Sequence, residues 1–133
     1  MKFALTIAAS DPSGGAGIEA DLKVFARLGV FGLTAITGIT IQGPGKVKGL
    51  IPVPIKEFEQ ILRILKLGLK LDAVKIGALV SAKHLKVVKN FLKETTVKVV
   101  LDPILSSSSG FPLLERKAQN QLISLFPLVS LIT

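Results

Sequence analysis

The fold of this chain is decided near its start by the stretch FALTIAASDPSGGAGI, residues 3–18. Its first part, Phe3 to Ala9, is apolar except for one threonine and predicts a buried strand. A loop with three glycines follows, Ser10 to Gly17, and an apolar helical pattern begins at Ile18. A glycine-rich loop between a strand and a helix brings backbone N–H groups close to a small polar ligand, and the helix N-terminus adds partial positive charge. The stretch therefore predicts a β-loop-α unit that helps to build a binding site.

Strand-like and helix-like segments alternate along the rest of the chain. Residues with helical apolar spacing are expected to form helices over 18–28, 55–69, 81–93 and 115–126. Short apolar and β-branched runs are expected to form strands over 33–41, 73–76, 97–101 and 128–132, with an edge segment over 47–53. Such alternation is typical of a parallel sheet covered by helices on both faces. The prediction is therefore an α/β fold, a three-layer α/β/α arrangement with a mostly parallel sheet, as one domain over 1–133.

The composition limits the classes of protein to which the chain can belong. With 133 residues, 49% of them hydrophobic, and a mean hydropathy of +0.59, it can bury one core but has little room for two. The absence of cysteine excludes a disulfide framework and a thiolate metal site within these residues, and fits a cytoplasmic protein. The longest uncharged stretch, 29–45, is interrupted by threonine and glycine, so we expect no membrane partner.

The positive charge of the chain raises the question of nucleic-acid binding. The net charge is +8, from 17 Lys and Arg against 9 Asp and Glu. The lysines are dispersed along helix-like segments, and the chain has no Trp or Tyr to stack on bases. Solvated helix faces explain the charge better, and we expect no nucleic-acid partner. His84, the single histidine, lies in one lysine-rich segment and is expected on the protein surface.

Four loops follow the predicted core strands at their carboxyl ends, and a parallel sheet would bring them to one edge. They span residues 10–17, 40–43, 77–81 and 102–110. Gln42 can donate and accept hydrogen bonds at once, which suits recognition of a heteroaromatic ring, although a solvated turn residue is the alternative. Asp102 could meet Mg²⁺ or a phosphate-bound water, or simply form a turn. Asp11 is expected to bind nearby backbone amides of its own loop, and Lys75 to face a sheet edge or pair locally.

The glycine-rich loop does not match the common phosphate-binding patterns. No Gly-Lys-Ser/Thr sequence closes it, and Gly14, Gly15 and Gly17 have the wrong spacing for a dinucleotide fingerprint. Two interpretations remain: a turn that lets the helix pack close to the sheet, and a loop whose backbone amides contact a ligand.

Five segments carry a resemblance to a known family. The chain resembles the hydroxymethylpyrimidine and phosphomethylpyrimidine kinases of thiamine biosynthesis, which belong to the ribokinase-like superfamily. The similar segments, in chain order, are Thr6–Lys23, Thr40–Gln42, Val74–Gly77, Val100–Pro103 and Leu128–Thr133. The resemblance covers the whole chain, and its first segment is highly specific.

The resemblance implies a kinase that uses ATP and Mg²⁺ to phosphorylate 4-amino-5-hydroxymethyl-2-methylpyrimidine and then its monophosphate. By position, Gln42 would bind the aminopyrimidine edge, and Asp102 would lie toward the phosphates and the metal. The loop with Gly14 and Gly15 would close around the pyrimidine. The other residues expected to shape the ring pocket are Ala9, Ala16, Thr40, Ala78 and Ile104.

This sequence departs from the usual family pattern at several positions. Ala9 replaces a glycine, Glu19 a glutamine, Gly43 an asparagine, Ala78 a methionine and Ser108 a lysine. Family members are also about twice as long. The resemblance places the chain in the N-terminal, substrate-binding half, so a truncated ribokinase-like fold with no catalytic residue of its own is expected, and these residues alone should be inactive.

Two alternatives remain open from the sequence. The half-fold could be a non-catalytic binding or oligomerisation module, with an exposed strand edge paired in a homo-oligomer such as a dimer. The chain could also belong to a related kinase that acts on pyridoxal-type substrates.

Overall fold

The structure, a computed structural model, describes residues 1–133 and contains the predicted alternation of strands and helices. The strands are β1 (Phe3–Ser10), β2 (Phe31–Gly43), β3 (Lys46–Pro52), β4 (Ala73–Ile76), β5 (Lys98–Leu101) and β6 (Leu131–Ile132). The helices are α1 (Gly17–Arg27), α2 (Ile55–Gly68) and α3 (Ala82–Lys93), with two 3₁₀ segments, η1 (Arg116–Ala118) and η2 (Asn120–Leu128). None of the helices combines the length and the apolarity that crossing a membrane requires.

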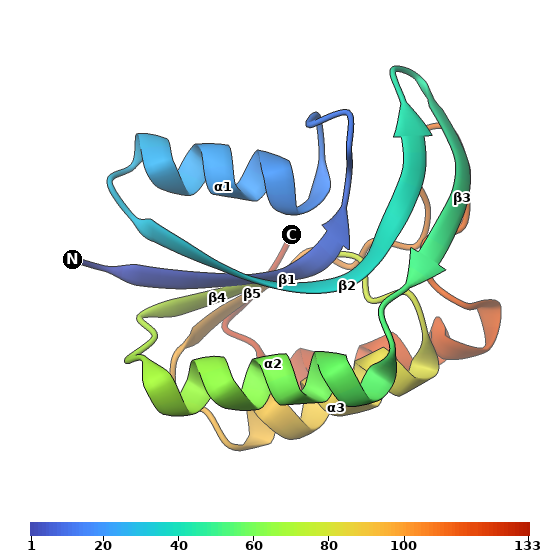
Figure 1. Cartoon of the computed structure of the whole chain (residues 1–133). Coiled ribbons are helices and arrows are strands. Elements are labelled where there is room, and N and C mark those ends of the chain that lie inside the picture. The colour runs from blue at the N-terminus through green and yellow to red at the C-terminus, as the bar shows by residue number, and fades with distance from the viewer.

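The strands form one six-stranded sheet in the order β3-β2-β1-β4-β5-β6. All neighbouring pairs are parallel except β2 and β3, which are antiparallel. Helix α1 covers one face of the sheet, and α2 and α3 cover the other (Figure 1). This arrangement confirms the predicted three-layer α/β fold with a mostly parallel sheet. It also places the carboxyl ends of β1, β2, β4 and β5 at one edge, because these four strands run in the same direction.

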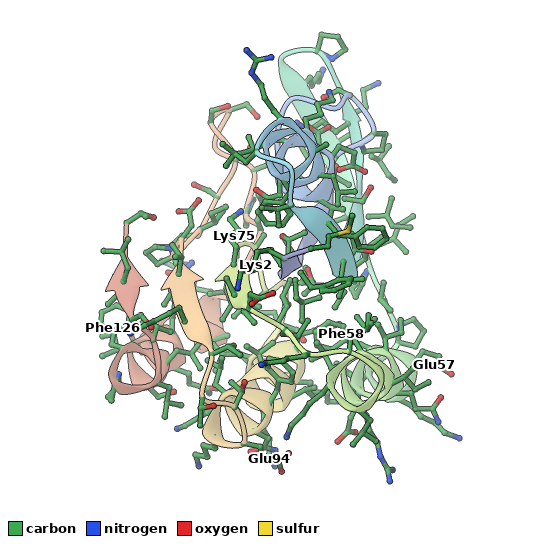
Figure 2. The ribbon with its side chains drawn as sticks, turned by 90° about the vertical axis from the view of Figure 1, so that its left-hand side faces the viewer. Lys2, Glu57, Phe58, Lys75, Glu94 and Phe126 are labelled. Atoms are coloured by element: carbon green, nitrogen blue, oxygen red, sulfur yellow. The ribbon has the colours of Figure 1, made fainter.

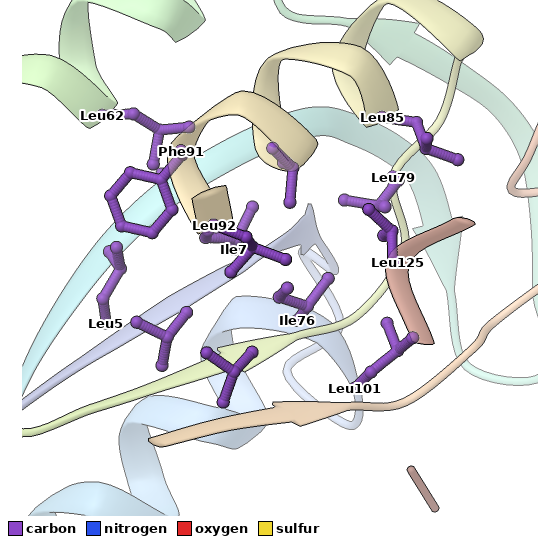
Figure 3. Packing of buried hydrophobic residues seen from close by; sticks show 14 of the residues in the cluster. Leu5, Ile7, Leu62, Ile76, Leu79, Leu85, Phe91, Leu92, Leu101 and Leu125 are labelled. Carbon is purple, nitrogen blue, oxygen red and sulfur yellow. The ribbon is translucent and has the colours of Figure 1, made fainter. Parts of the chain in front are cut away.

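The main hydrophobic core lies between the sheet and the layer of α2, α3 and η2. Alternate residues of the central strands point into it, since successive side chains of a strand face opposite sides of the sheet. Nineteen buried residues form this cluster, including Leu5, Ile7, Ile76, Leu101 and Leu125 (Figure 3). The α1 face of β1 instead carries the smaller Ala4, Thr6 and Ala8. That face is therefore free to hold polar groups beneath α1.

The predicted helix over 115–126 is wrong in type. This stretch forms the 3₁₀ segments η1 and η2, and η2 contains Pro127. Proline has no backbone N–H, so the last turn of η2 cannot close with an α-helical hydrogen bond from Pro127, and nothing in the structure explains the 3₁₀ form of the earlier turns. The apolar pattern correctly marked a segment that packs on the core, since Leu122 and Leu125 are buried.

The expectation that His84 lies on the surface is also wrong, because its side chain is only 1% exposed. Its Nε2 lies 2.9 Å from the carbonyl oxygen of Val53, and its Nδ1 lies 2.7 Å from the hydroxyl of Ser81. A carbonyl oxygen only accepts, so Nε2 carries the proton and Nδ1 accepts from Ser81. Ser81, the predicted N-cap of α3, in turn accepts a hydrogen bond from the His84 backbone. A neutral imidazole thus ties α3 to the segment before α2.

Burial makes His84 a source of pH-dependent stability. Burial lowers the pKa of His84 below its ordinary value of 6.5, against smaller opposing effects of the Val53 carbonyl and Glu115. Between the two pKa values the unfolded chain binds the proton more readily, so the free energy of unfolding should be greatest above pH 6.5 and fall as the pH drops below it. Urea unfolding at a series of pH values measures this.

Because the chain has one histidine, a single substitution isolates the effect. His84→Gln keeps a side-chain N–H donor for Val53 but does not titrate, so the slope of stability against pH near neutrality should disappear. An unchanged slope in this variant would show that the dependence comes from other groups.

Candidate functional site

A small pocket opens at the carboxyl ends of β1, β2 and β4. Its volume is about 60 Å³. Its walls combine small apolar side chains with a few polar ones, from Ala8, Ala9, Ser10, Asp11, Ala16, Gly17, Thr40, Gln42, Lys75, Ala78, Ile104 and Leu113. Wider hollows of about 360 and 450 Å³ lie between α2 and α3 and between α3 and η2, and they share no lining residue with this pocket. Since ligands of open α/β sheets bind at the carboxyl ends of strands, the small pocket is the candidate site.

Asp11 holds the glycine-rich loop in shape. Its carboxylate accepts hydrogen bonds from the Ser13 hydroxyl at 2.6 Å, the Ser13 N–H at 2.9 Å and the Ala16 N–H at 2.9 Å. Burial raises the pKa of Asp11, but these hydrogen bonds outweigh it and hold the pKa below its ordinary value. The role predicted for Asp11 is confirmed. Because the N–H groups of Ser13 and Ala16 serve Asp11, the loop forms a wall of the pocket without offering these two donors to a ligand.

Glu19 fastens the same loop to the first turn of α1. One carboxylate oxygen accepts a short hydrogen bond from the Ser10 hydroxyl, and the other accepts from the Asp11 N–H at 2.7 Å. A carboxylate can accept both bonds, whereas a glutamine amide has only one accepting oxygen. A glutamate is therefore well matched to these two partners.

Thr40 and Gln42 form the polar wall on β2. The Thr40 hydroxyl lies 3.0 Å from the Ser10 carbonyl oxygen and 2.9 Å from Oε1 of the Gln42 side-chain amide. A hydroxyl has one hydrogen, and the Ser10 carbonyl can only accept it. Both contacts are satisfied when the Gln42 amide is rotated by about 180°, which exchanges its oxygen and its NH₂ group. The NH₂ group then donates to the Thr40 hydroxyl. In that orientation the Gln42 carbonyl oxygen is left to accept a hydrogen bond from a ligand.

Lys75 also lines the pocket, and the sequence did not single it out as a site residue. Its ammonium group is 3.0 Å from Asp21 Oδ2 on α1, and the Thr6 hydroxyl donates to the same oxygen at 2.6 Å. The side chains of Lys75 and Asp21 are only 23% and 16% exposed. The signal was a charged residue inside the apolar strand Ala73–Ile76, directly before a loop of the predicted site. The expectation that Lys75 faces a sheet edge or pairs locally is wrong, because β4 lies between β1 and β5 and the partner of Lys75 is 54 positions away.

The structure brings together six of the residues expected to bind substrate. Those lining the pocket are Ala9, Ala16, Thr40, Gln42, Ala78 and Ile104. Ala78 is fixed there because its carbonyl oxygen accepts a 2.7 Å hydrogen bond from Thr37. Gly14 and Gly15 lie in the loop but not in the pocket wall. Asp102 follows β5, where its carboxylate is half-buried and makes no hydrogen bond within the chain.

Comparisons with known proteins agree with this architecture. Residues 11–133 match the family model described as phosphomethylpyrimidine kinase. The hydroxymethylpyrimidine/phosphomethylpyrimidine kinase of Haemophilus influenzae is 42% identical over 135 aligned positions, which cover 100% of this chain and 50% of that protein. The corresponding enzyme of Bacillus subtilis is 40% identical over 112 positions, or 84% of this chain and 41% of that protein.

Solved structures give the same result. A crystal structure of phosphomethylpyrimidine kinase from Clostridium difficile superimposes with a TM-score of 0.91 at 36% identity, and covers 99% of this chain and 58% of that one. An ADP complex of Bacillus subtilis pyridoxal kinase has a TM-score of 0.84 at 33% identity, with 99% and 51% covered. This chain thus spans about half the length of the relatives that it matches. On its sequence and its fold, the chain belongs to the phosphomethylpyrimidine kinase family.

Proposed function

We propose that this chain forms the pyrimidine-binding part of a kinase that phosphorylates 4-amino-5-hydroxymethyl-2-methylpyrimidine and its monophosphate in thiamine biosynthesis. The observation that carries the proposal is the convergence of Thr40, Gln42 and a ring of small apolar residues on one pocket. The relatives of Haemophilus influenzae and Bacillus subtilis, both hydroxymethylpyrimidine/phosphomethylpyrimidine kinases, support it. Ala9, Ala16 and Ala78 would contact the faces of a flat ring, and Gln42 would supply its polar recognition.

Gln42 would recognise the amino group of the ring. With its NH₂ group turned to Thr40, its carbonyl oxygen accepts a hydrogen bond from the exocyclic amine, and this match discriminates against rings that carry an acceptor there. The loop with Gly14 and Gly15 would close over the ring beside Ala16.

ATP and Mg²⁺ would enter on the side of β5. Asp102 fits this role because its carboxylate lies at a strand end and has no partner within the chain, and Mg²⁺ prefers oxygen ligands of this kind. The metal would neutralise charge on the phosphates during transfer. In this proposal the pyrimidine and Asp102 lie at the same carboxyl edge of the sheet. The 133 residues bind the pyrimidine but do not phosphorylate it. Catalysis would require residues that the longer relatives have in their other half.

In this proposal the protein acts in the cytoplasm and forms a homo-oligomer such as a dimer. The hairpin of β2 and β3 supports association, because β3 is an edge strand and Ile39, Ile41 and Ile51 are exposed on this hairpin.

Replacing Gln42 by alanine should weaken binding of the pyrimidine about 10- to 100-fold, since a buried hydrogen bond to a ligand contributes about 1–3 kcal/mol. Calorimetry with 4-amino-5-hydroxymethyl-2-methylpyrimidine measures this change. Gln60→Ala is the matched control, because Gln60 is exposed on α2 and should leave the affinity unchanged.

Two outcomes would contradict the proposal in different ways. No binding of the pyrimidine to the unmodified chain would contradict the function, and tighter binding of pyridoxal would favour the pyridoxal-type alternative. Equal affinity of the unmodified chain and Gln42→Ala would instead contradict only the role of Gln42.

A further inference from the structure

We propose that Lys75 is a second recognition residue of the pocket, which donates a hydrogen bond to the ring nitrogen on the side of the pyrimidine opposite Gln42. The inference rests on the proposed function and extends it to a residue inside the sheet. In this arrangement Lys75 touches the ligand, and Asp21 and Thr6 act through it as positioning residues.

The first support is the direction in which Lys75 points. It pairs in register with Thr6 on the neighbouring strand β1. Figure 2 shows it on the α1 side of the sheet, whereas Phe58 lies on the side of α2. The hydrophobic core therefore does not surround its ammonium group. That group lies instead between Asp21 of α1 and the pocket, and Lys75 is the one cationic residue among the pocket-lining side chains.

Gly77 gives the second support, because it leaves the space through which Lys75 reaches the pocket. A Cβ atom placed at Gly77 would lie 3.1 Å from Lys75 Nζ and 3.0 Å from the Cβ of Ala8. The ammonium group of Lys75 thus extends along the strand to the level of Gly77. This places it at the carboxyl edge of the sheet, where the ligand is expected.

The partners of Lys75 hold it in place without using all of its donors. An ammonium group has three N–H donors, and Asp21 takes one of them at 3.0 Å. The Thr6 hydroxyl donates to the same Asp21 oxygen and so fixes the carboxylate from below. The side chain of Lys75 is partly exposed, at 23%, toward the pocket that it lines. An N–H group of the positively charged Lys75 side chain therefore remains, in a fixed position, to donate to an acceptor atom of a ligand.

The order of the strands identifies which acceptor this is. Gln42 is on β2 and Lys75 is on β4, and β1 lies between these two strands. Neighbouring strands are about 4.8 Å apart, so the backbones of β2 and β4 are separated by about 10 Å. A ring that lies across the end of β1, over Ala8 and Ala9, therefore meets Gln42 on one side and Lys75 on the other.

The chemistry of the ring then selects N1. In 4-amino-5-hydroxymethyl-2-methylpyrimidine the amino group and N3 are adjacent, and N1 is on the opposite side of the ring. If Gln42 accepts from the amino group, N1 faces Lys75. An unprotonated ring nitrogen only accepts, which matches an ammonium group, whereas a ring protonated at N1 would be repelled. Lys75 would thereby select the neutral ring in one orientation.

A thermodynamic cycle tests this contact. Calorimetry would compare the unmodified chain and Lys75→Met, each with the pyrimidine and with an analogue in which CH replaces N1. Lys75→Met should bind the pyrimidine about tenfold more weakly, and the analogue should lose about tenfold on the unmodified chain, as expected for one hydrogen bond to a charged group. The two losses should not add, because both remove the same contact. Lys98→Met is the control, since this lysine is exposed at the opposite end of β5.

The alternative is that Lys75 serves only as an ion pair that joins α1 to the sheet. In that case Lys75→Met would lower the stability of the protein, but the ratio of its affinities for the pyrimidine and the analogue would equal the ratio for the unmodified chain. That result would overturn the proposal. Failure of the unmodified chain to bind the pyrimidine would overturn the proposed function itself.

A second measurement does not depend on the folding of a variant. In unmodified protein labelled with ¹⁵N at lysine, the Nζ resonance of Lys75 should shift when the pyrimidine is added and remain in place with the analogue that lacks N1. Identical shifts with both ligands would exclude the contact.

Discussion

Replacing Gly17 by alanine is expected to lower the free energy of unfolding by about 3 kcal/mol or more and to remove ligand binding. Gly17 has a φ of +58°, in the left-handed region that residues with a Cβ rarely adopt. A Cβ at this position would lie 2.3 Å from the carbonyl oxygen of Ala9 and 3.3 Å from the backbone nitrogen of Asp11. Both contacts are with backbone atoms, so no flexible side chain can move aside. The first turn of α1 would have to separate from β1, and the wall of the pocket would move with it.

Gly45→Ala is the matched control for this prediction. Gly45 has a similar φ of +73°, but no atom lies within 4 Å of its Cβ position. The free energy of unfolding of this variant should fall only by what a left-handed conformation costs a residue with a Cβ, about 1–2 kcal/mol. Its affinity for the pyrimidine should not change. Urea unfolding and calorimetry measure the two effects. Equal losses in the two variants would show that the contact with Ala9 is relieved by a small shift and does not shape the site.

The order of the elements could be predicted because their signals are local. Apolar runs such as Phe3–Ala9 and Ala73–Ile76 form strands as expected, and the glycine-rich loop joins β1 to α1. The parallel arrangement then follows from the alternation of strands and helices. Convergence of Thr40, Gln42 and Ala78 on one pocket could be predicted for the same reason, since they lie at or just after the carboxyl ends of strands that run in one direction.

The environments of His84 and Lys75 could not be predicted in this way. Each depends on a partner distant in sequence: Val53 is 31 positions from His84, and Asp21 is 54 positions from Lys75. The residues around His84 are rich in lysine, which correctly marks one exposed face of α3 but not the face on which the histidine lies. For Lys75, the sequence shows a charge in a buried strand but not that α1 places a carboxylate above it.

Among single substitutions in the core, Phe58→Ala is expected to destabilise the protein most, by about 3–5 kcal/mol. Phe58 is fully buried at the start of α2, and its ring meets the imidazole of His84 edge to face, with 5.1 Å between ring centroids. A truncated side chain would leave a cavity between α2, α3 and the sheet, because close-packed neighbours relax only partly. Small domains are typically stable by about 5–15 kcal/mol, so this single change removes a large share of the total.

Leu67→Ala provides the control on the same helix, because Leu67 is 76% exposed and its truncation should change stability by about 0.5 kcal/mol or less. Urea unfolding of both variants measures the difference, and losses within about 1 kcal/mol of each other would contradict the packing described for α2. The pH dependence supplies an independent check. Burial lowers the pKa of His84, so a cavity beside its ring that admits water should bring this pKa closer to its ordinary value. Phe58→Ala should therefore weaken the dependence of stability on pH below 6.5 as well as the stability itself.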